Sequence, residues 1–250
     1  MEQGARIRRT DVARVTMMTK VDAPAVQGRV LQLHSHPSRS ATTVAPPPVS
    51  SAVPRPVAQA ARSGEFLIRL LDIVGSLAIL VLALPAMIVA AVLIKVTSTG
   101  PVFYKQERVG QGGQLFTLYK FRTMIDNAEK QIGPVWASPD DHRVTPVGRI
   151  LRRMRLDELP QLLNILWGDM SLVGPRPERP FFVERHQALQ GVRLAVKPGL
   201  TGLAQVRSYY NLKPAHKARY DYLYIQNRSL FLNISILLQT IPVLFAKKGW

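Results

Sequence analysis

The sequence predicts a mainly helical α+β protein. It has a re-entrant membrane helix near the N-terminus, followed by a compact domain with a short β-hairpin and amphipathic helices at the membrane surface. Three observations support this prediction: residues 73–94 carry no charge over 22 positions, two β-prone segments surround a glycine-rich turn after residue 100, and four later segments have helical patterns. We expect three parts, a disordered tail (1–65), the membrane helix (66–97) and the compact domain (98–250).

Composition restricts the classes of function before any motif is considered. The net charge is +17, from 33 Lys and Arg against 16 Asp and Glu. Such an excess favours an anionic partner, which leaves nucleic acid, an anionic membrane and a phosphorylated substrate as options. The chain contains no cysteine, so disulfides, thiolate zinc sites and a cysteine nucleophile are excluded.

The tail at 1–65 contains no aromatic residue but 7 of the 19 prolines. A segment of this kind buries too little apolar surface to offset its loss of conformational entropy, so we expect disorder. It has no apolar run of the length that a signal peptide requires. A partner-binding arm and a variable extension both remain open for it.

The uncharged run from Ile73 to Ile94 is long enough for a helix that spans a bilayer. Pro85 lies near its middle and should bend the helix, because proline removes a helical hydrogen bond. Basic residues exceed acidic ones on both flanks, and positive charge resists translocation. These features favour a helix that enters and returns on the same side, and an ordinary span with a tolerated proline is the alternative.

The remaining elements follow from local patterns. Val102–Gln106 and Leu115–Phe121 are expected to form a hairpin. The expected helices are Thr145–Met154, Leu159–Trp167, His216–Gln226 and Ser229–Ala246. The last has a broad apolar face and ends in lysines, so it either lies on an anionic membrane surface or packs against the domain.

The chemistry is expected around the acidic pair Asp157 and Glu158. Pro160 suits the first turn of a helix, so the simplest role for an isolated acidic pair here is a helix cap. The surroundings are unusually basic, with Arg149, Arg152, Arg153, Arg155 and Arg176 nearby in the sequence. Carboxylates beside guanidiniums stay ionised, and the same positive field attracts phosphate oxygens. The pattern therefore favours phosphoryl transfer with an anionic nucleophile, although Arg149 and Arg153 suit anionic lipid equally well.

A second basic pair, Lys120 and Arg122, lies in the segment YKFRTM, where a strand would place both on one face. Lys120 suits a phosphate contact, although such a pair is more often a solvated face. The chain has neither the P-loop nor the dinucleotide-binding glycine pattern, and its histidines lack metal-ligand spacing.

From about residue 66 to 250 the chain resembles the bacterial sugar transferase family, the small monotopic polyprenyl-phosphate phosphoglycosyl transferases. The most specific shared motifs are LDELPQL, GDMSLVGPRP and PGLTGLAQV, which occur here in the family's order. The resemblance implies an enzyme that transfers a phosphosugar from a UDP-sugar to a polyprenyl (undecaprenyl) phosphate and releases UMP. It also implies a bacterial inner membrane protein whose catalytic domain faces the cytoplasm, acting at the start of surface glycan synthesis.

The resemblance carries over to particular residues. Asp157 is expected to be the covalent phosphosugar carrier and Glu158 to hold a magnesium ion or handle a proton, with both carboxylates as candidate Mg²⁺ ligands. Lys120, Arg152 and Arg176 are expected to bind phosphates. Arg122, Lys197 and Gln205 are weaker candidates for contacts with the nucleotide.

The sequence departs from the family at Leu84, where a serine often precedes the proline, at Arg155, and at Lys197, where an arginine is common. Two rival interpretations exist, a non-catalytic membrane scaffold of the same fold and a nucleic-acid binder. The intact acidic pair argues against the first. The lack of a recognition motif, and carboxylates that would repel a nucleic-acid backbone, argue against the second. The sequence leaves monomer and homo-oligomer both open.

Overall fold

The computed structural model describes residues 64–128, 133, 141–207 and 214–245. Its helices are α2 (Glu65–Thr97), α3 (Pro146–Arg153), α4 (Gln161–Trp167), α5 (Pro180–Arg185), α6 (Leu203–Arg207), α7 (Pro214–Gln226) and α8 (Leu230–Phe245). Its strands are β1 (Phe103–Val109), β2 (Leu115–Phe121), β3 (Ser171–Val173) and β4 (Gly199–Thr201), and two 3₁₀ turns matter for the site, η2 (Leu156–Glu158) and η4 (Gly191–Ala195). The described residues are mainly helical, as predicted, whereas residues 1–63 of the predicted tail lie outside them.

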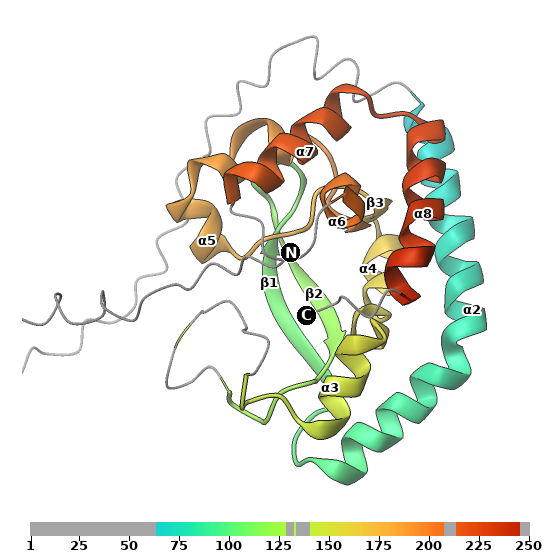
Figure 1. The fold of residues 1–250 in the computed structure, drawn as a ribbon, viewed down its shortest axis with the longest axis vertical. Helices are drawn as coiled ribbons and strands as arrows, with labels where there is room; N and C mark the ends of the chain where they lie inside the picture. Colours follow the sequence, from blue (N-terminus) through green and yellow to red (C-terminus); the bar gives the residue numbers. More distant parts are fainter. Residues whose placement is uncertain (1–63, 129–132, 134–140, 208–213, 246–250) are drawn as a thin grey trace, which may run out of the picture. The chain divides into compact units, whose positions relative to one another are not determined.

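The apolar segment forms one continuous helix, α2, which includes Pro85. Its 33 residues would measure about 50 Å if straight, at a rise of ~1.5 Å per residue. Figure 1 shows that α2 bends, so that its first half runs beside α8 and its second half turns toward α3. Among the described helices, α2 is the one whose length and composition would allow it to cross a membrane.

Polar side chains fix the first half of α2 to the domain. Asp72 accepts hydrogen bonds from Ser171 Oγ (2.9 Å) and from the backbone N–H of Leu172 (2.8 Å). Arg69 donates to the carbonyl oxygens of Ile165 (2.6 Å) and Leu166 (2.9 Å), at the C-terminal end of α4. The first half of α2 is therefore joined to both α4 and β3.

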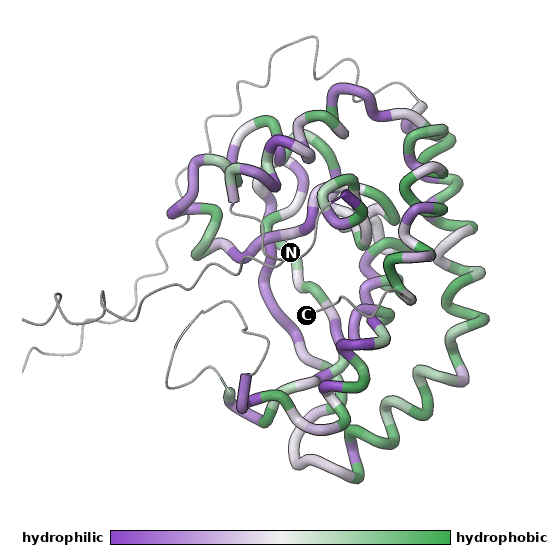
Figure 2. The backbone as a smooth tube through the Cα atoms, in the orientation of Figure 1, coloured by the Kyte–Doolittle hydropathy of each residue, from purple (hydrophilic) through white to green (hydrophobic). Residues whose placement is uncertain are grey.

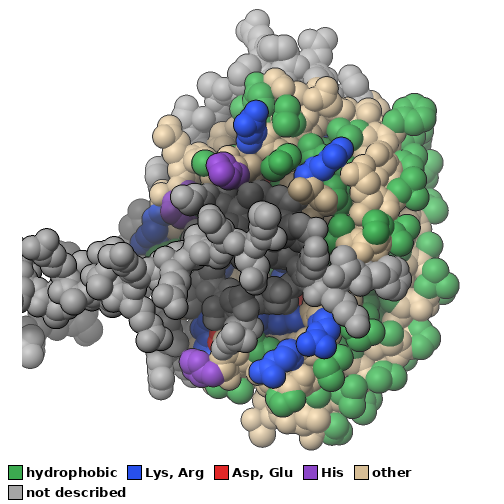
Figure 3. All heavy atoms as spheres, viewed as in Figure 1, with side chains coloured by type: hydrophobic (Ala, Val, Ile, Leu, Met, Phe, Trp, Pro, Cys, Tyr) green, Lys and Arg blue, Asp and Glu red, His purple; other side chains and the backbone are tan. Residues whose placement is uncertain are grey.

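The second half of α2 packs on the same domain through apolar contacts. Ala90 and Ile94 are buried in a cluster with Phe121 and Leu151. Between the two attached ends the helix is exposed, with Leu82 82% accessible. Figures 2 and 3 show the resulting apolar edge along α2 and α8. Both ends of α2 thus contact one domain, while its middle presents hydrocarbon outward.

The predicted hairpin is present, with β1 and β2 paired antiparallel from Phe103↔Phe121 to Val109↔Leu115. Its first strand extends three residues beyond the predicted end. The side chain of Asn164, on α4, satisfies free backbone groups at the other edge of β2. It accepts from Tyr119 N (3.1 Å) and donates to Thr117 O (2.7 Å). These bonds hold α4 beside the strand that carries Lys120.

A parallel pair of three-residue strands, β3 and β4, lies in the core and was not predicted. The strands approach so closely that a Cβ on Gly199 would lie 2.0 Å from Gly174 N, so this position requires glycine. The pair contributes Leu172 and Val173 to the main apolar cluster. The other buried members of this cluster include Leu118, Leu162, Ile165, Met170, Tyr224, Ile225 and Ile236. This cluster fixes the backbone that leads from β3 to Arg176.

Helix α8 has one face on the domain and one face exposed. Ile236 and Asn233 are fully buried, and Asn233 Oδ1 accepts a hydrogen bond from Tyr224 Oη (2.9 Å). On the opposite face, Phe231 and Leu238 are 83% and 61% accessible. Packing against the domain, one of the two predicted alternatives, is thus observed, and it leaves a second apolar face free.

Candidate active site

The acidic pair lies in η2, between α3 and α4. Arg155 adopts a left-handed conformation (φ 60°) just before the turn and so ends the α3 segment sharply. Pro160 then stands at the N-cap of α4. Both carboxylate residues are 8% accessible, so the turn holds two acidic side chains in a largely buried position.

Glu158 is held by two cationic side chains. Its Oε1 accepts from Lys120 Nζ (3.2 Å) and Arg176 Nη2 (2.5 Å), and its Oε2 accepts from Arg176 Nη1 (3.4 Å). The structure thus brings two of the predicted phosphate-binding residues, Lys120 and Arg176, into contact with the acidic pair. Burial alone would raise the pKa of Glu158, but Arg176 and Lys120 outweigh it and hold that pKa well below its usual range.

Asp157 has a different environment. Among the described residues, no side chain or backbone group forms a hydrogen bond or ion pair with its carboxylate. Burial and the neighbouring Glu158 raise the pKa of Asp157 to about 6, against the opposing effect of Lys120 and Arg152. It remains mostly ionised at neutral pH, as expected from the sequence, but as an unpaired anion rather than a salt-bridged one. An unpaired, desolvated carboxylate is a better nucleophile than one that two cations hold.

Arg152 reaches the pair from α3. Its Nε donates to Thr123 Oγ1 (2.7 Å), just beyond the end of β2, and its charge favours ionisation of Asp157. Helix α3 is held there by Gly148, where a Cβ would lie 2.0 Å from the carbonyl oxygen of Thr123. Sequence analysis missed Thr123; a hydroxyl residue directly after a basic strand end was the available signal. Figure 3 shows Lys and Arg side chains gathered over α3 on this face.

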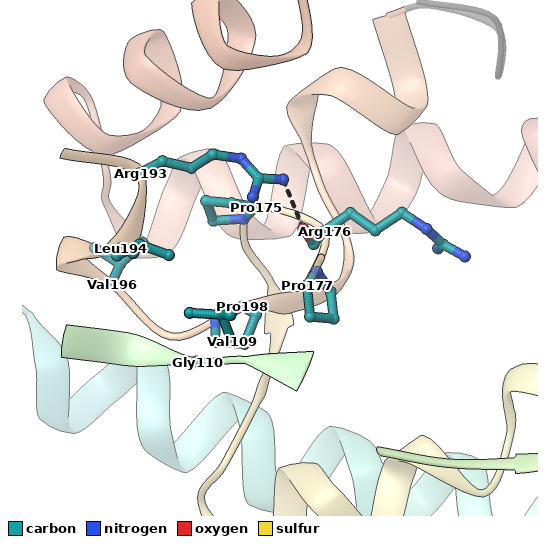
Figure 4. A pocket seen from close by; sticks show the side chains of 9 residues that line it. All are labelled: Val109, Gly110, Pro175, Arg176, Pro177, Arg193, Leu194, Val196 and Pro198. Atoms are coloured by element: carbon teal, nitrogen blue, oxygen red, sulfur yellow. Dashed lines mark hydrogen bonds between the residues drawn. The ribbon is translucent and has the colours of Figure 1, made fainter. Parts of the chain in front are cut away.

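Arg176 lies in the loop after β3, between Pro175 and Pro177. Figure 4 shows a small pocket beside this loop, lined in part by Val109, Val196 and Pro198, and the Arg176 side chain extends away from it. Glu158 raises the pKa of Arg176 further above its already high value, so this guanidinium is a permanent cation at the site.

None of the three weaker candidates contacts the acidic pair within the described residues. Arg122 donates to the carbonyl oxygens of Ser98 (2.9 Å) and Thr99, where it joins the end of α2 to β2. The amino group of Lys197 lies near Gly168, beside Arg69 and the first half of α2. The buried amide of Gln205 has no hydrogen-bond partner within the described part of the chain. The structure thus gathers five of the eight predicted site residues, and in the described part of the chain these three make no contact with the pair.

The acidic pair fits a magnesium ion that arrives with a substrate. In the described ranges no group of three or more His, Asp or Glu side chains is arranged to hold a metal. Mg²⁺ is usually bound through one or two carboxylates together with substrate phosphates. The free oxygens of Asp157 are available for this, whereas the oxygens of Glu158 are shared with Lys120 and Arg176.

Comparison with known proteins identifies the family. The model described as "Bacterial sugar transferase" matches residues 63–247. The chain is 43% identical over 190 residues to an Aeromonas hydrophila protein named UDP-N-acetylgalactosamine-undecaprenyl-phosphate N-acetylgalactosaminephosphotransferase, which covers 74% of this chain and 45% of that relative. It is 40% identical over 205 residues to the undecaprenyl-phosphate galactose phosphotransferase of Salmonella typhimurium, with 76% of this chain and 43% of that relative covered.

A third relative matches over nearly its whole length. The exopolysaccharide production protein ExoY of Sinorhizobium fredii is 34% identical over 226 residues, which is 85% of this chain and 97% of that protein. By contrast, the chain spans less than half the length of the Aeromonas and Salmonella relatives. The match of the family model and the site geometry agree: this chain belongs to the bacterial sugar transferase family.

Proposed function

We propose that this protein transfers a phosphosugar from a UDP-sugar to polyprenyl (undecaprenyl) phosphate through a covalent intermediate on Asp157, releasing UMP. The names of the relatives support this reaction class, since they specify undecaprenyl phosphate as the acceptor of a sugar phosphate. They differ in the sugar, which is N-acetylgalactosamine in one relative and galactose in another. The proposal therefore concerns the UDP-sugar class, and the product would begin the synthesis of a surface polysaccharide or glycoconjugate.

One observation carries the assignment of roles: two adjacent carboxylates have opposite environments. Lys120 and Arg176 hold Glu158, whereas Asp157 is unpaired among the described residues and has its pKa raised to about 6. Such divergence between neighbouring acids separates their chemical roles. Glu158 orients the two cations, and Asp157 is left free to attack.

The reaction has two displacements at one phosphorus atom. An oxygen of Asp157 bonds to the phosphorus that bears the sugar, and the bond from that phosphorus to UMP breaks, so UMP leaves with the electron pair. A phosphate oxygen of the lipid then bonds to the same phosphorus, and the bond to Asp157 breaks, which restores the carboxylate. One site can serve both substrates in turn because UMP leaves before the lipid reacts.

The cations around the pair offset the charge of the phosphates. Lys120, Arg152 and Arg176 lie close enough to influence the ionisation of Asp157, so they also act on phosphate oxygens brought to it. A magnesium ion held through Asp157, whose oxygens are not shared with Lys120 or Arg176, would supply further charge neutralisation on the diphosphate.

We further propose that α2 is re-entrant in the bacterial inner membrane and that the domain faces the cytoplasm. A straight span separates its two ends by a hydrocarbon core of about 30 Å. Here Asp72 near one end and Ile94 near the other are both buried against the same domain. This arrangement supports a helix that enters and leaves on one side, where the soluble UDP-sugar and the lipid phosphate meet.

Trapping the intermediate tests the proposal. The purified protein, Mg²⁺ and a panel of UDP-sugars are mixed without lipid acceptor, and peptides are examined by mass spectrometry. We expect a phosphosugar adduct on the peptide that contains Asp157 and UMP release that stops near one per protein molecule. Asp157→Asn should abolish the adduct and lower turnover by at least ~10²-fold. Glu184→Gln, a change at an exposed acid on α5, serves as the control and should retain both.

Two outcomes would contradict the proposal. UMP release only in the presence of lipid, with no adduct, would indicate a direct displacement in which Asp157 is a metal ligand or base. No UMP release with any UDP-sugar, with or without lipid, would favour the non-catalytic scaffold.

A further inference from the structure

The loop that carries Arg176 is held from behind by two arginines, the buried Arg193 and the half-buried Arg108. Arg193, on η4, donates from Nη2 to the carbonyl oxygen of Arg176 (2.6 Å), as Figure 4 shows. Arg108, near the end of β1, donates from Nη1 to the carbonyl oxygen of Pro177 (2.9 Å). These bonds fix the backbone on either side of Pro177, directly after Arg176, while the Arg176 side chain reaches away to Glu158.

Each of these arginines is paired with a buried carboxylate. Arg193 Nε lies 2.7 Å from Asp221 Oδ2, and their side chains are 5% and 2% accessible. Arg108 Nη1 lies 4.0 Å from Glu178 Oε2, in a longer and weaker contact. The closer pair therefore provides the firmer support, and it stands directly behind Arg176.

Both contacts lead to one face of α7. Asp221 is on α7, and Lys217, four residues earlier and so on the same face, lies 3.7 Å from Glu178 Oε1. Lys217 is thus linked to Glu178, and Asp221 to Arg193. Among the described residues, neither Lys217 nor Asp221 contacts the acidic pair, so the contacts link α7 to the site through the Arg176 loop.

The energetics favour a geometric role for this arrangement. Desolvation makes a buried ion pair a poor source of net stability, so replacing it with apolar residues is often neutral or stabilising. A bidentate guanidinium does, however, fix the relative position of the two groups that it binds. Arg193 uses one nitrogen for Asp221 and another for the Arg176 carbonyl. The position of α7 therefore helps to fix the position of the Arg176 backbone.

We propose that Asp221 and Arg193 are positioning residues for the transferase reaction: α7 holds Arg193 through Asp221, and Arg193 holds the backbone of Arg176. This inference rests on the proposed function, because it assigns Arg176 to the phosphates. A displacement of Arg176 would weaken its forked contact with Glu158 and misplace its charge relative to the diphosphate. Misplacement by about 1 Å can cost about 10²-fold in rate.

Two substitutions test the chain of contacts. Asp221→Asn keeps the shape but removes the charge that holds Arg193. Arg193→Lys keeps a cation but offers one nitrogen, which cannot reach Asp221 and the Arg176 carbonyl in the same way. Each should lower the single-turnover rate of UMP release by about 10- to 100-fold in samples shown to be folded.

Glu65→Gln is the control for removal of a carboxylate from an ion pair. Like Asp221, Glu65 pairs with a buried arginine, in this case Arg228, but that pair joins α2 to the segment just before α8 and does not contact Arg176. The Glu65 side chain is 48% accessible, so we expect Glu65→Gln to lower Tm less than Asp221→Asn and to leave the rate of the folded protein within about twofold. Both variants are assayed well below their Tm, so a loss of rate confined to Asp221→Asn reports positioning and not unfolding.

A double-mutant cycle with Arg176→Ala decides the inference. If Asp221 acts through the Arg176 side chain, adding Asp221→Asn to Arg176→Ala should change the residual rate by less than about threefold. An undiminished 10- to 100-fold effect in that background, or no effect of Asp221→Asn in the wild type, would overturn it. A wild-type protein that forms no adduct and releases no UMP would contradict the proposed function itself. A wild-type protein and an Asp221→Asn variant that are equally active would contradict only the positioning role of Asp221.

Discussion

At the scale of single residues, the site depends on a difference between the surroundings of two neighbouring carboxylates. Asp157 and Glu158 are adjacent and equally buried, yet only Glu158 has cations within hydrogen-bond distance among the described residues. The turn η2 places the Glu158 carboxylate against Lys120 and Arg176, whereas the Asp157 carboxylate has no such partner in the described residues. This divergence predicts opposite responses to mutation.

The first prediction concerns stability. Glu158→Gln leaves Lys120 and Arg176 buried without their counter-charge and should cost about 3–5 kcal/mol of unfolding free energy. Asp157→Asn removes a buried charge that lacks a partner and should leave Tm unchanged or raise it, although activity is lost. Thermal unfolding at pH 7.5 measures both. Equal destabilisation by the two changes would contradict the assigned environments.

The second prediction concerns pH. The pKa of Asp157 is raised to about 6, so the carboxylate gains a proton as the pH falls through 6 and loses its nucleophilic form. The rate of the first UMP release, measured without lipid, should be near its maximum at pH 7.5 and fall to about a tenth at pH 5. Circular dichroism at both pH values controls for unfolding. A rate that stays constant down to pH 5 would exclude Asp157 as the titrating nucleophile.

At the scale of elements, short contacts at glycine set the distance between α3 and β2. A Cβ at Gly148 would lie 2.0 Å from a backbone oxygen of Thr123, which cannot move without disturbing the end of β2. A Cβ at Gly75 would instead meet the end of the Leu172 side chain at 2.7 Å, which has more freedom to move.

The third prediction uses this contrast. Gly148→Ala should destabilise the protein by about 1–3 kcal/mol and reduce activity, because it pushes α3 and Arg152 away from the pair. Gly75→Ala should cost less and leave the rate nearly unchanged. Chemical denaturation and single-turnover assays on both variants make the comparison, and the reverse order of effects would show that α3 does not set the position of Arg152.

The elements that the sequence predicted are those with a strong local pattern. The hairpin, α3, α4, α7 and α8 were anticipated because apolar periodicity and turn residues specify them within one segment. The pair β3–β4 was missed because each strand has three residues and pairs with a segment more than twenty positions away. The supports of Arg176 were missed for the same reason, since Arg193 and Asp221 meet only in three dimensions.

The site residues show the same contrast between features that a local sequence pattern specifies and features that depend on tertiary contacts. Motif resemblance singled out the residues that surround the acidic pair. It did not reveal that Arg122 instead closes the junction between α2 and β2, because side-chain direction after a strand end depends on tertiary contacts. Nor did residue types indicate that burial would raise the pKa of Asp157, since burial is a property of the whole fold.

At the scale of the whole molecule, the attachment of both halves of α2 to one domain predicts its topology. The chain contains no cysteine, so single cysteines introduced at Phe66 and Val96, both strongly exposed, can be labelled selectively. In spheroplasts both should be protected from an impermeant thiol reagent, and in inverted vesicles both should react. Labelling of one position from each side would establish a spanning helix. Pro85→Leu in the same assay reports whether the proline is needed for the bend.

The hydrogen bond between Asp72 and Ser171 also has a consequence for biosynthesis. The two residues are 99 positions apart, and translation at about 5–20 residues per second separates their appearance by about 5–20 s. In the proposed topology, the apolar segment would leave the ribosome and meet the bilayer while its aspartate still lacks Ser171 and Leu172 as hydrogen-bond donors. Insertion would then come first, and the nascent domain would fold onto a helix that is already in the lipid. A pulse-chase experiment should accordingly detect a membrane-bound, protease-sensitive intermediate before the compact, resistant form accumulates.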